Sequence, residues 1–279
     1  MKDDAIDSVI TAALKEDLPQ GDITSESIIP EGSRSEAIVL AKQEGVLAGL
    51  DVAKRVFAKI DDDLEFRKMK EDGQSFDAGE KLAVIRGSSI SILKGERTAL
   101  NFLQRMSGIA STTWRFVQAL EGTKTKILDT RKTTPGLRTL EKYAVKMGGG
   151  KNHRHNLSEM VMIKDNHLKL VGSISEAVQR AKERVEPGIK VEVEATTLDE
   201  VKEAVRSGAD MVMLDNMSIK KMREVVNWMK GKVPLEVSGK VSLDRIREIA
   251  ALGVDFISVG SLTHSYRSVD ISIEFTGEL

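Results

Sequence analysis

The sequence predicts an α/β protein in which an α+β domain precedes an incomplete parallel (β/α) barrel. From about residue 126 onward, short apolar runs alternate with segments whose apolar residues recur at helical spacing. Glu194, Asp215, Ser238 and Gly260 end four of these runs and follow one another at intervals of 21, 23 and 22 residues. Such a regular strand-plus-helix period indicates parallel βα units.

The predicted barrel domain spans residues 109–267 and contains six strands. Polar residues recur at the C-terminal end of each strand, and in a barrel these ends converge on one mouth, where active sites lie. Six βα units are fewer than the eight of a closed barrel, so we expect an incomplete one. The predicted strands are 126–132, 160–167, 190–195, 211–216, 234–239 and 256–261, and the predicted helices are 174–185, 198–208, 219–231 and 242–253.

Residues 1–108 lack this period and predict a separate α+β domain. Strands are expected at 37–50 and 80–87, and helices at 50–60 and 92–106. The C-terminal segment 268–279 alternates apolar and polar residues, so it is expected to add a strand to the first domain.

Composition excludes several classes of protein. The 42 Lys and Arg residues balance 43 Asp and Glu residues, which argues against binding to nucleic acid or to a membrane surface. Cysteine is absent, so disulfides and thiolate metal sites are excluded. No apolar run approaches the roughly 20 residues that span a bilayer, and the N-terminus lacks a signal pattern. We therefore expect a cytoplasmic protein.

The balanced total conceals a basic stretch. Between residues 124 and 169 there are eleven Lys and Arg residues against four Asp and Glu residues, which favours an anion site. Arg131 and Lys132 end the first predicted strand, where a guanidinium grips a carboxylate or phosphate at two points and a lysine adds a point charge. Lys164 ends the next strand and is expected to bind anions too, with Asp165 holding it in place.

The glycine-rich segment 148–155 has three interpretations. It is not a P-loop, because no Ser or Thr follows its lysine and no strand precedes its glycines. It closes over an anionic substrate with His153 and Arg154 as donors, or it binds zinc through His153 and His155, or it is a mobile surface loop. Zinc is the weaker ligand hypothesis, because no third ligand lies at a useful spacing.

Two carboxylates and two pairs of small residues end the later strands. Glu194 and Asp215 at one barrel mouth are suited to hold Mg²⁺ through waters, to accept hydrogen bonds from ribose hydroxyls, or to stabilise a cationic centre. Glu194 is preferred to Glu192 because it lies nearer the end of its strand. The pairs Ser238–Gly239 and Gly260–Ser261 let backbone N–H groups approach a phosphate.

A long central segment, LDTRKTTPGLRTLEKYAVKMGGGKNHRHNL at 128–157, carries a specific resemblance. Matching segments extend it over nearly the whole chain: 16–25, 44–50, 95–111, 163–167, 191–195, 213–216, 235–239 and 258–265. Together they resemble quinolinate phosphoribosyltransferase, a type II phosphoribosyltransferase family also called nicotinate-nucleotide pyrophosphorylase (carboxylating).

The resemblance implies a reaction and an architecture. The family joins quinolinate to phosphoribosyl pyrophosphate, releases pyrophosphate and CO₂, and yields nicotinate mononucleotide for NAD biosynthesis. It requires Mg²⁺. The family fold is an α/β sandwich domain followed by an incomplete barrel, and a homodimer or higher assembly shares its active sites between subunits.

The resemblance also implies roles for individual residues. The implied quinolinate ligands are Thr130, Arg131, His153, Arg154 and Lys164, with Arg97 contributed by the partner subunit. Lys132 and Lys164 would face the phosphates of the second substrate, and Glu194 and Asp215 would hold ribose hydroxyls or Mg²⁺; these four make up the implied catalytic set. The implied 5′-phosphate ligands are Ser238, Gly239, Lys240, Gly260 and Ser261.

Two positions depart from the family pattern. Lys240 stands where a second glycine is common, so a positive φ there would strain the lysine, or the lysine would add a phosphate contact. Ser261 stands where alanine is common.

Other functions compete with this expectation. A relative of the same fold would use nicotinate without decarboxylation, or would be the molybdenum-associated relative of unknown substrate. The number of cations, Arg97, Arg131, Arg154 and Lys164, suits two carboxylates better than one. A metal-dependent hydrolase using His153 and His155 and a non-catalytic binding protein are the alternatives from other classes.

Overall fold

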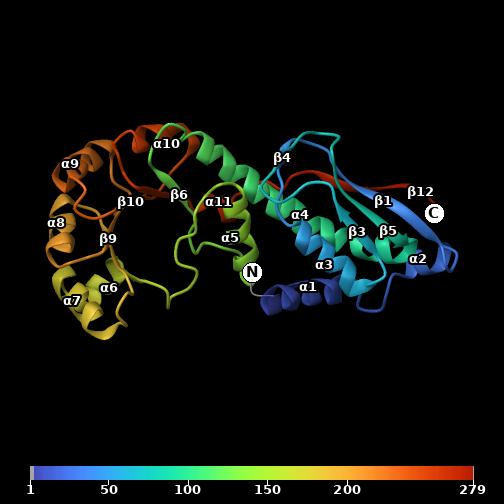
Figure 1. The fold of residues 1–279 in the computed structure, drawn as a ribbon. Coiled ribbons are helices and arrows are strands. Elements are labelled where there is room, and N and C mark those ends of the chain that lie inside the picture. The colour runs from blue at the N-terminus through green and yellow to red at the C-terminus, as the bar shows by residue number, and fades with distance from the viewer. Residues whose placement is uncertain (1–2, 279) are drawn as a thin grey trace. The chain divides into compact units, whose positions relative to one another are not determined.

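Strand pairing divides the chain into two main sheets of different construction. In the computed structural model, which describes residues 3–278, one sheet is antiparallel with four strands and the other is parallel with six (Figure 1). This confirms the predicted α/β class with an α+β part and an incomplete parallel barrel. The contacts within the chain define two compact units, one around each sheet.

The first unit contains the antiparallel sheet, in the order β12-β1-β5-β3, and a two-stranded sheet of β2 and β4. It comprises the residues up to Trp114, Thr133–Gly149 and the residues from Ser261 onward. The strands are β1 (Arg34–Ala41), β2 (Gly45–Val46), β3 (Glu65–Lys68), β4 (Ser75–Phe76), β5 (Lys81–Ser88) and β12 (Ile271–Glu278). The helices are α1 (Asp3–Asp17), α2 (Ile23–Ile28), α3 (Leu50–Ile60), α4 (Ser89–Gln118), α5 (Arg138–Met147) and α11 (Ser261–His264).

The C-terminal strand β12 pairs antiparallel with β1, so that Val39 lies opposite Ile273. Residue 108, the predicted end of the first domain, lies inside α4. A Cβ atom at Gly108 would lie 2.2 Å from the carbonyl oxygen of Arg267, so only glycine lets the helix approach that backbone this closely. The predicted domain bounds stay a prediction.

The second unit contains the parallel sheet, in the order β6-β11-β10-β9-β8-β7. Its strands are β6 (Lys126–Leu128), β7 (Val161–Ile163), β8 (Val191–Ala195), β9 (Met211–Asp215), β10 (Leu235–Ser238) and β11 (Phe256–Ser258). Its helices are α6 (Asp165–Val171), α7 (Ile174–Arg184), α8 (Leu198–Arg206), α9 (Ile219–Met229) and α10 (Leu243–Ala250). The two end strands, β6 and β7, do not pair within residues 3–278, and the sheet is not closed.

Successive side chains along the parallel strands point alternately to the two faces of the sheet. Val193, Leu214 and Val237 are fully buried, as expected for residues that face the covering helices. Polar caps begin those helices: Thr197 accepts from the backbone N–H of Glu200, whose side chain returns to the cap. The intervening strand residues, among them Glu192 and Glu236, belong to the opposite face.

Several predicted elements differ from the structure. The strands predicted at 126–132 and 160–167 end at Leu128 and Ile163, because the chain turns away after β6 and begins α6 at Asp165. His167 caps α6 by accepting from the backbone N–H of Lys164 at 2.9 Å, which the apolar pattern did not indicate. The strand predicted at 37–50 is interrupted after Ala41, and helix α5 was not predicted.

No helix in the described part of the chain is both long enough and apolar enough to cross a membrane.

Candidate active site

The loops after the parallel strands carry most of the predicted site residues. In the second unit, Asp215 lies opposite Ser238 on the neighbouring strand, and Glu194 lies opposite Met213. Residues that are paired across neighbouring strands share one face of the sheet. Asp215 and Ser238 therefore present their side chains together at the C-terminal edge, with Glu194 one step below Asp215 on the adjoining strand.

Two partly buried arginines, Arg131 and Arg154, belong to loops of the second unit. Arg131 follows β6, and Arg154 is anchored by donating from Nη1 to the carbonyl oxygen of Met160 at 2.8 Å. Burial, together with the charge of Arg131, lowers the pKa of Arg154 below its usual value. A half-buried cation whose charged form is disfavoured in this way favours the binding of an anion beside it.

Lys164 follows β7 and forms an ion pair with Glu194, with 2.7 Å between Nζ and Oε2. The Glu194 side chain is 14% exposed and that of Lys164 is 43% exposed, so the ammonium end of the pair stays open to solvent. Asp165 was expected to hold Lys164, but the ion pair of Lys164 is with Glu194. Asp165 begins α6 and pairs with Lys169, one helical turn along, at 3.3 Å.

The turn after β9 orients Asp215. Asn216 has a φ of +50° and donates from Nδ2 to the Asp215 carboxylate at 2.7 Å. Its backbone N–H donates to the carbonyl oxygen of Ser238 at 3.0 Å, which ties the two turns together. A Cβ atom at Gly239 would lie 2.3 Å from Asn216 Oδ1, so glycine is required there by a neighbouring turn as well as by its own φ of +93°.

Lys240 adopts a φ of +46°, which is the left-handed conformation. This is the strained backbone that was expected if a lysine occupies a position where the family commonly has glycine.

Replacing Lys240 with glycine is expected to raise the free energy of unfolding by about 1 kcal/mol, since a left-handed non-glycine residue costs about that much. Urea unfolding measures the change. Lys240→Ala is the matched control, because it removes the charge but keeps a Cβ, and its free energy of unfolding should not rise. Equal free energies of unfolding in the two variants would contradict the proposal that the left-handed backbone at Lys240 is strained.

His153 lies among buried carboxylates. Its Nε2 is 3.1 Å from Glu192 Oε2 and 3.4 Å from Glu236 Oε2, and both glutamates are fully buried. Burial disfavours the charged ring, but the hydrogen bond to Glu192 and the proximity of Glu236 outweigh it and raise the pKa of His153 to about 9. Burial also raises the pKa of Glu192 above its usual value, against the influence of His153.

The two glutamates between which the sequence left the choice open, Glu192 and Glu194, differ in depth and in partner. Glu192 and Glu194 alternate with buried valine on β8 and share a face, but they occupy different depths. Glu192 is buried against His153, whereas Glu194 is partly exposed and pairs with Lys164. His155, the second histidine of the zinc hypothesis, is not part of the ligand-spaced group of His153, Glu192 and Glu236 identified within residues 3–278.

Asp129 anchors the glycine-rich segment and was missed by the sequence reasoning. It directly follows β6, is fully buried, and accepts from the backbone N–H of His153 at 2.8 Å and from the Asn152 side chain. An acidic residue in the middle of the predicted strand 126–132 was the available signal. The end of the strand was predicted at Arg131 and Lys132, so the functional role was given to these two residues.

The remaining predicted residues lie as follows. Thr130 accepts from the backbone N–H of Lys132 at 3.0 Å, which shapes the turn that carries the exposed Lys132. Gly260 ends the second unit, and Ser261 begins the short helix α11 of the first. Arg97 is exposed on α4, also in the first unit.

A divalent metal fits the carboxylates at the strand ends. Glu194 and Asp215 offer hard oxygen ligands, which Mg²⁺ prefers, and Mg²⁺ keeps most of its waters in such sites. Asp215 is partly exposed and Asn216 fixes its orientation, so it remains accessible to a hydrated ion.

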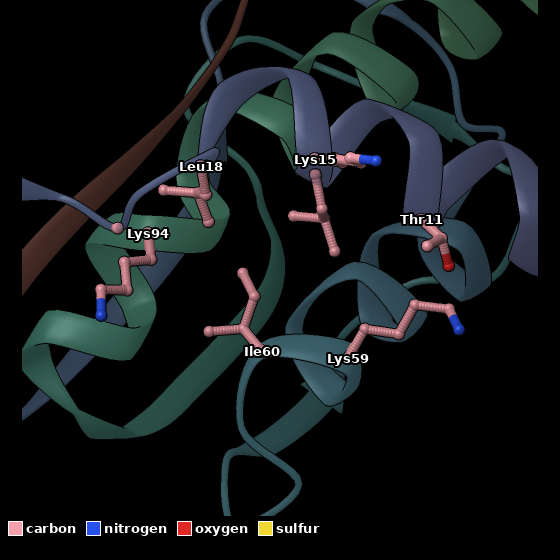
Figure 2. A pocket seen from close by; sticks show the side chains of 8 residues that line it. Thr11, Lys15, Leu18, Lys59, Ile60 and Lys94 are labelled. Atoms are coloured by element: carbon pink, nitrogen blue, oxygen red, sulfur yellow. The ribbon is translucent and has the colours of Figure 1, made fainter.

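The first unit contains a hollow, which differs from the proposed anion site. Its volume is about 580 Å³, and three lysines are among the lining residues in Figure 2. Lys94 is paired with Glu26 at 2.6 Å and Lys59 with Asp7 at 3.9 Å. Acidic partners thus already balance two of its cations, which argues against an anion site there.

Comparison with known proteins places both parts of the chain in one family. The family model "Quinolinate phosphoribosyl transferase, N-terminal domain" matches residues 22–107, and the model of the C-terminal domain of the same enzyme matches residues 109–274.

Individual relatives agree with the family match. A probable nicotinate-nucleotide pyrophosphorylase [carboxylating] of Bacillus subtilis is 42% identical over 94% of this chain and 90% of its own length. A quinolinate phosphoribosyltransferase [decarboxylating] of Nicotiana tabacum is 39% identical over 97% of this chain and 82% of its own length. The solved NadC structure from Streptococcus pyogenes covers 100% of this chain and 98% of that one, with 41% identity and a TM-score of 0.95.

Proposed function

The chain belongs to the quinolinate phosphoribosyltransferase family, and from this membership we propose that it transfers a phosphoribosyl group to quinolinate with decarboxylation. The products are nicotinate mononucleotide, pyrophosphate and CO₂, as in the de novo synthesis of NAD. The observation that carries the proposal is the family match over residues 22–107 and 109–274, which leaves neither part of the chain outside the family.

Quinolinate binding is assigned to the cations beside the parallel sheet. Arg131 and Arg154 are neighbours whose repulsion a dicarboxylate relieves, and Thr130, His153 and Lys164 complete the proposed set. Two guanidiniums and one ammonium suit two carboxylates better than one, which favours quinolinate over nicotinate. Lys132 and Lys164 face the phosphates of phosphoribosyl pyrophosphate, and Ser238, Gly239, Lys240, Gly260 and Ser261 bind its 5′-phosphate.

The reaction follows from charge and position. The bond from ribose C1 to pyrophosphate breaks, its electron pair leaves with pyrophosphate, and positive charge grows at C1. Glu194 and Asp215 stabilise that charge. The bound quinolinate is held with its ring nitrogen in line with C1, so positioning supplies much of the rate.

Decarboxylation follows without a protein nucleophile. Once the ring nitrogen is quaternary, the adjacent carboxylate leaves as CO₂, and the cationic nitrogen stabilises the electron pair left on the ring carbon until that carbon takes a proton. Glu194 and Asp215 are also the residues that would hold Mg²⁺, which supplies neutralisation of the charge on the pyrophosphate leaving group.

We assign the active enzyme a dimeric assembly, with Arg97 from a second copy of the chain completing each quinolinate site. The exposure of Arg97 on α4 supports this role, because a buried side chain would be unable to reach a partner. The compartment proposed for the enzyme is the cytoplasm.

The decisive assay supplies the purified protein with Mg²⁺, phosphoribosyl pyrophosphate and either quinolinate or nicotinate. We expect turnover with quinolinate alone, with CO₂ and nicotinate mononucleotide formed in equal amounts. Turnover with nicotinate alone would keep the phosphoribosyl site and overturn the dicarboxylate assignment. Silence with both acceptors would refute the proposed reaction.

A further inference from the structure

The His153 side chain lies between two carboxylates that come from strands on either side of β9. Glu192 is on β8 and Glu236 is on β10, and both are inside the second unit at zero exposure. The imidazole itself is 6% exposed. Three ionisable side chains thus meet in the buried part of this unit, deeper than the partly exposed Glu194 and Asp215.

Neither glutamate has a second use in the described residues. Oε1 of Glu192 and both carboxylate oxygens of Glu236 are buried and make no hydrogen bond there. Glu192 makes its one hydrogen bond to His153, and Glu236 Oε2 lies 3.4 Å from the same ring nitrogen. Buried carboxylates with unsatisfied oxygens oppose folding, so a residue of this kind calls for a role other than packing. An apolar residue is tolerated in the same layer, because Met213 lies opposite Glu236 on the intervening strand.

The ring is fixed at both of its nitrogens. Nε2 faces the two glutamates, and Nδ1 lies 2.7 Å from the backbone nitrogen of Arg154. The backbone N–H of His153 donates to Asp129, so the main chain at this point is held as well. Because Arg154 is the next residue, the orientation of the His153 ring and the path of Arg154 toward Arg131 depend on one another.

We propose that Glu192 and Glu236 are positioning residues: Glu192 accepts the Nε2–H of His153, and the Glu236 carboxylate lies 3.4 Å from the same nitrogen. Together they fix the His153–Arg154 pair where an aromatic dicarboxylate binds. The inference deepens the proposed function and rests on it for the identity of the ligand. The glutamates themselves do not touch the substrate.

Glu192→Gln and Glu236→Gln test the inference, because they keep the size of the side chain and remove its charge. The KM for quinolinate is expected to rise about tenfold or more, a loss typical of removing the residue behind a binding histidine. The KM for phosphoribosyl pyrophosphate should stay within about twofold, because within residues 3–278 both glutamates pair with His153 and with none of the proposed phosphoribosyl ligands. Glu236→Asp, which keeps the charge, should retain part of the affinity.

A spectroscopic readout separates positioning from general damage. In the wild-type protein, the Nε2 proton of His153 should appear in the NMR spectrum as a downfield imidazole signal in slow exchange with water. It should move or disappear in both glutamine variants. The signals of His155, His167 and His264 provide the internal reference.

Glu141→Gln is the matched control. Glu141 is also fully buried and charged, but it pairs with Arg105 in the first unit. The change is expected to lower the free energy of unfolding and to leave the His153 signal and the KM for quinolinate unchanged.

Each other outcome overturns a specific statement. A wild-type KM for quinolinate in both glutamine variants would sink the positioning role, and so would the lack of a protected His153 signal in wild-type protein that turns over quinolinate. A tightly bound metal ion that is present in wild type and lost in Glu192→Gln would replace positioning by metal ligation. If wild type fails to use quinolinate while the protected signal is present, the proposed function fails and the His153 cluster stands.

Discussion

Arg131→Ala is expected to raise the KM for quinolinate at least about thirty-fold, because leaving one partner of a desolvated charge pair without its counterpart costs about 2 kcal/mol or more. The proposed partner of Arg131 is a quinolinate carboxylate that Arg154 also binds; burial and then the charge of Arg131 lower the pKa of Arg154. Steady-state kinetics with quinolinate varied at saturating phosphoribosyl pyrophosphate measures the change.

Two further variants sharpen this result. Arg131→Lys keeps the charge but loses the two-point grip, so its KM should fall between those of wild type and Arg131→Ala. Arg180→Ala removes a charge from the same unit at an exposed ion pair with Glu176 and should leave the kinetics unchanged. Normal quinolinate kinetics in Arg131→Ala would remove that residue from the site.

Asp215→Ala is expected to lower kcat about 100-fold with little change in either KM, since a group that stabilises charge only in the transition state acts on turnover. The Mg²⁺ concentration for half-maximal rate should also rise, because Asp215 is one of the two proposed metal residues. Glu194→Ala should act in the same direction, with an added effect from the loss of its ion pair with Lys164.

Asp199→Ala provides the control for removing an aspartate from the second unit. Asp199 lies on α8, and its side chain is 93% exposed where it meets Lys202. No change in kcat is expected there. A rise in KM alone in Asp215→Ala would refute the electrostatic role, since it would indicate an interaction made equally with substrate and transition state.

The sequence predicted the parallel unit well because its signal is periodic. Helices α7, α8, α9 and α10 each have a repeated apolar face and a recognisable cap or end, and the strands between them are apolar. Strands β6 and β7 are only three residues long, so the predictions there ran on into the loops and, at Asp165, into a helix. Short elements carry too few residues for alternation to define their ends.

Candidate site residues were recognisable where their chemistry conflicts with packing. Lys164 stood out as a charged residue at the end of an apolar strand, but its partner did not, because Glu194 is 30 residues away and Asp165 is adjacent. The same holds for His153. Its neighbour Glu192 is 39 residues away in the sequence, and its neighbour Glu236 is on β10, which β9 separates from the strand of Glu192. Such contacts depend on which strands the fold brings together, and local spacing does not encode them.

The partial burial of Arg154 also bears on the fraction of the protein that is folded. Burial and the charge of Arg131 disfavour the charged form of Arg154 in the folded chain, and the proposed dianionic substrate would offset that cost. Any ligand that prefers the folded chain raises its stability by mass action. Resistance to heat and to proteolysis should therefore follow the supply of the dicarboxylate acceptor, so that scarcity of its own substrate shortens the working life of the enzyme.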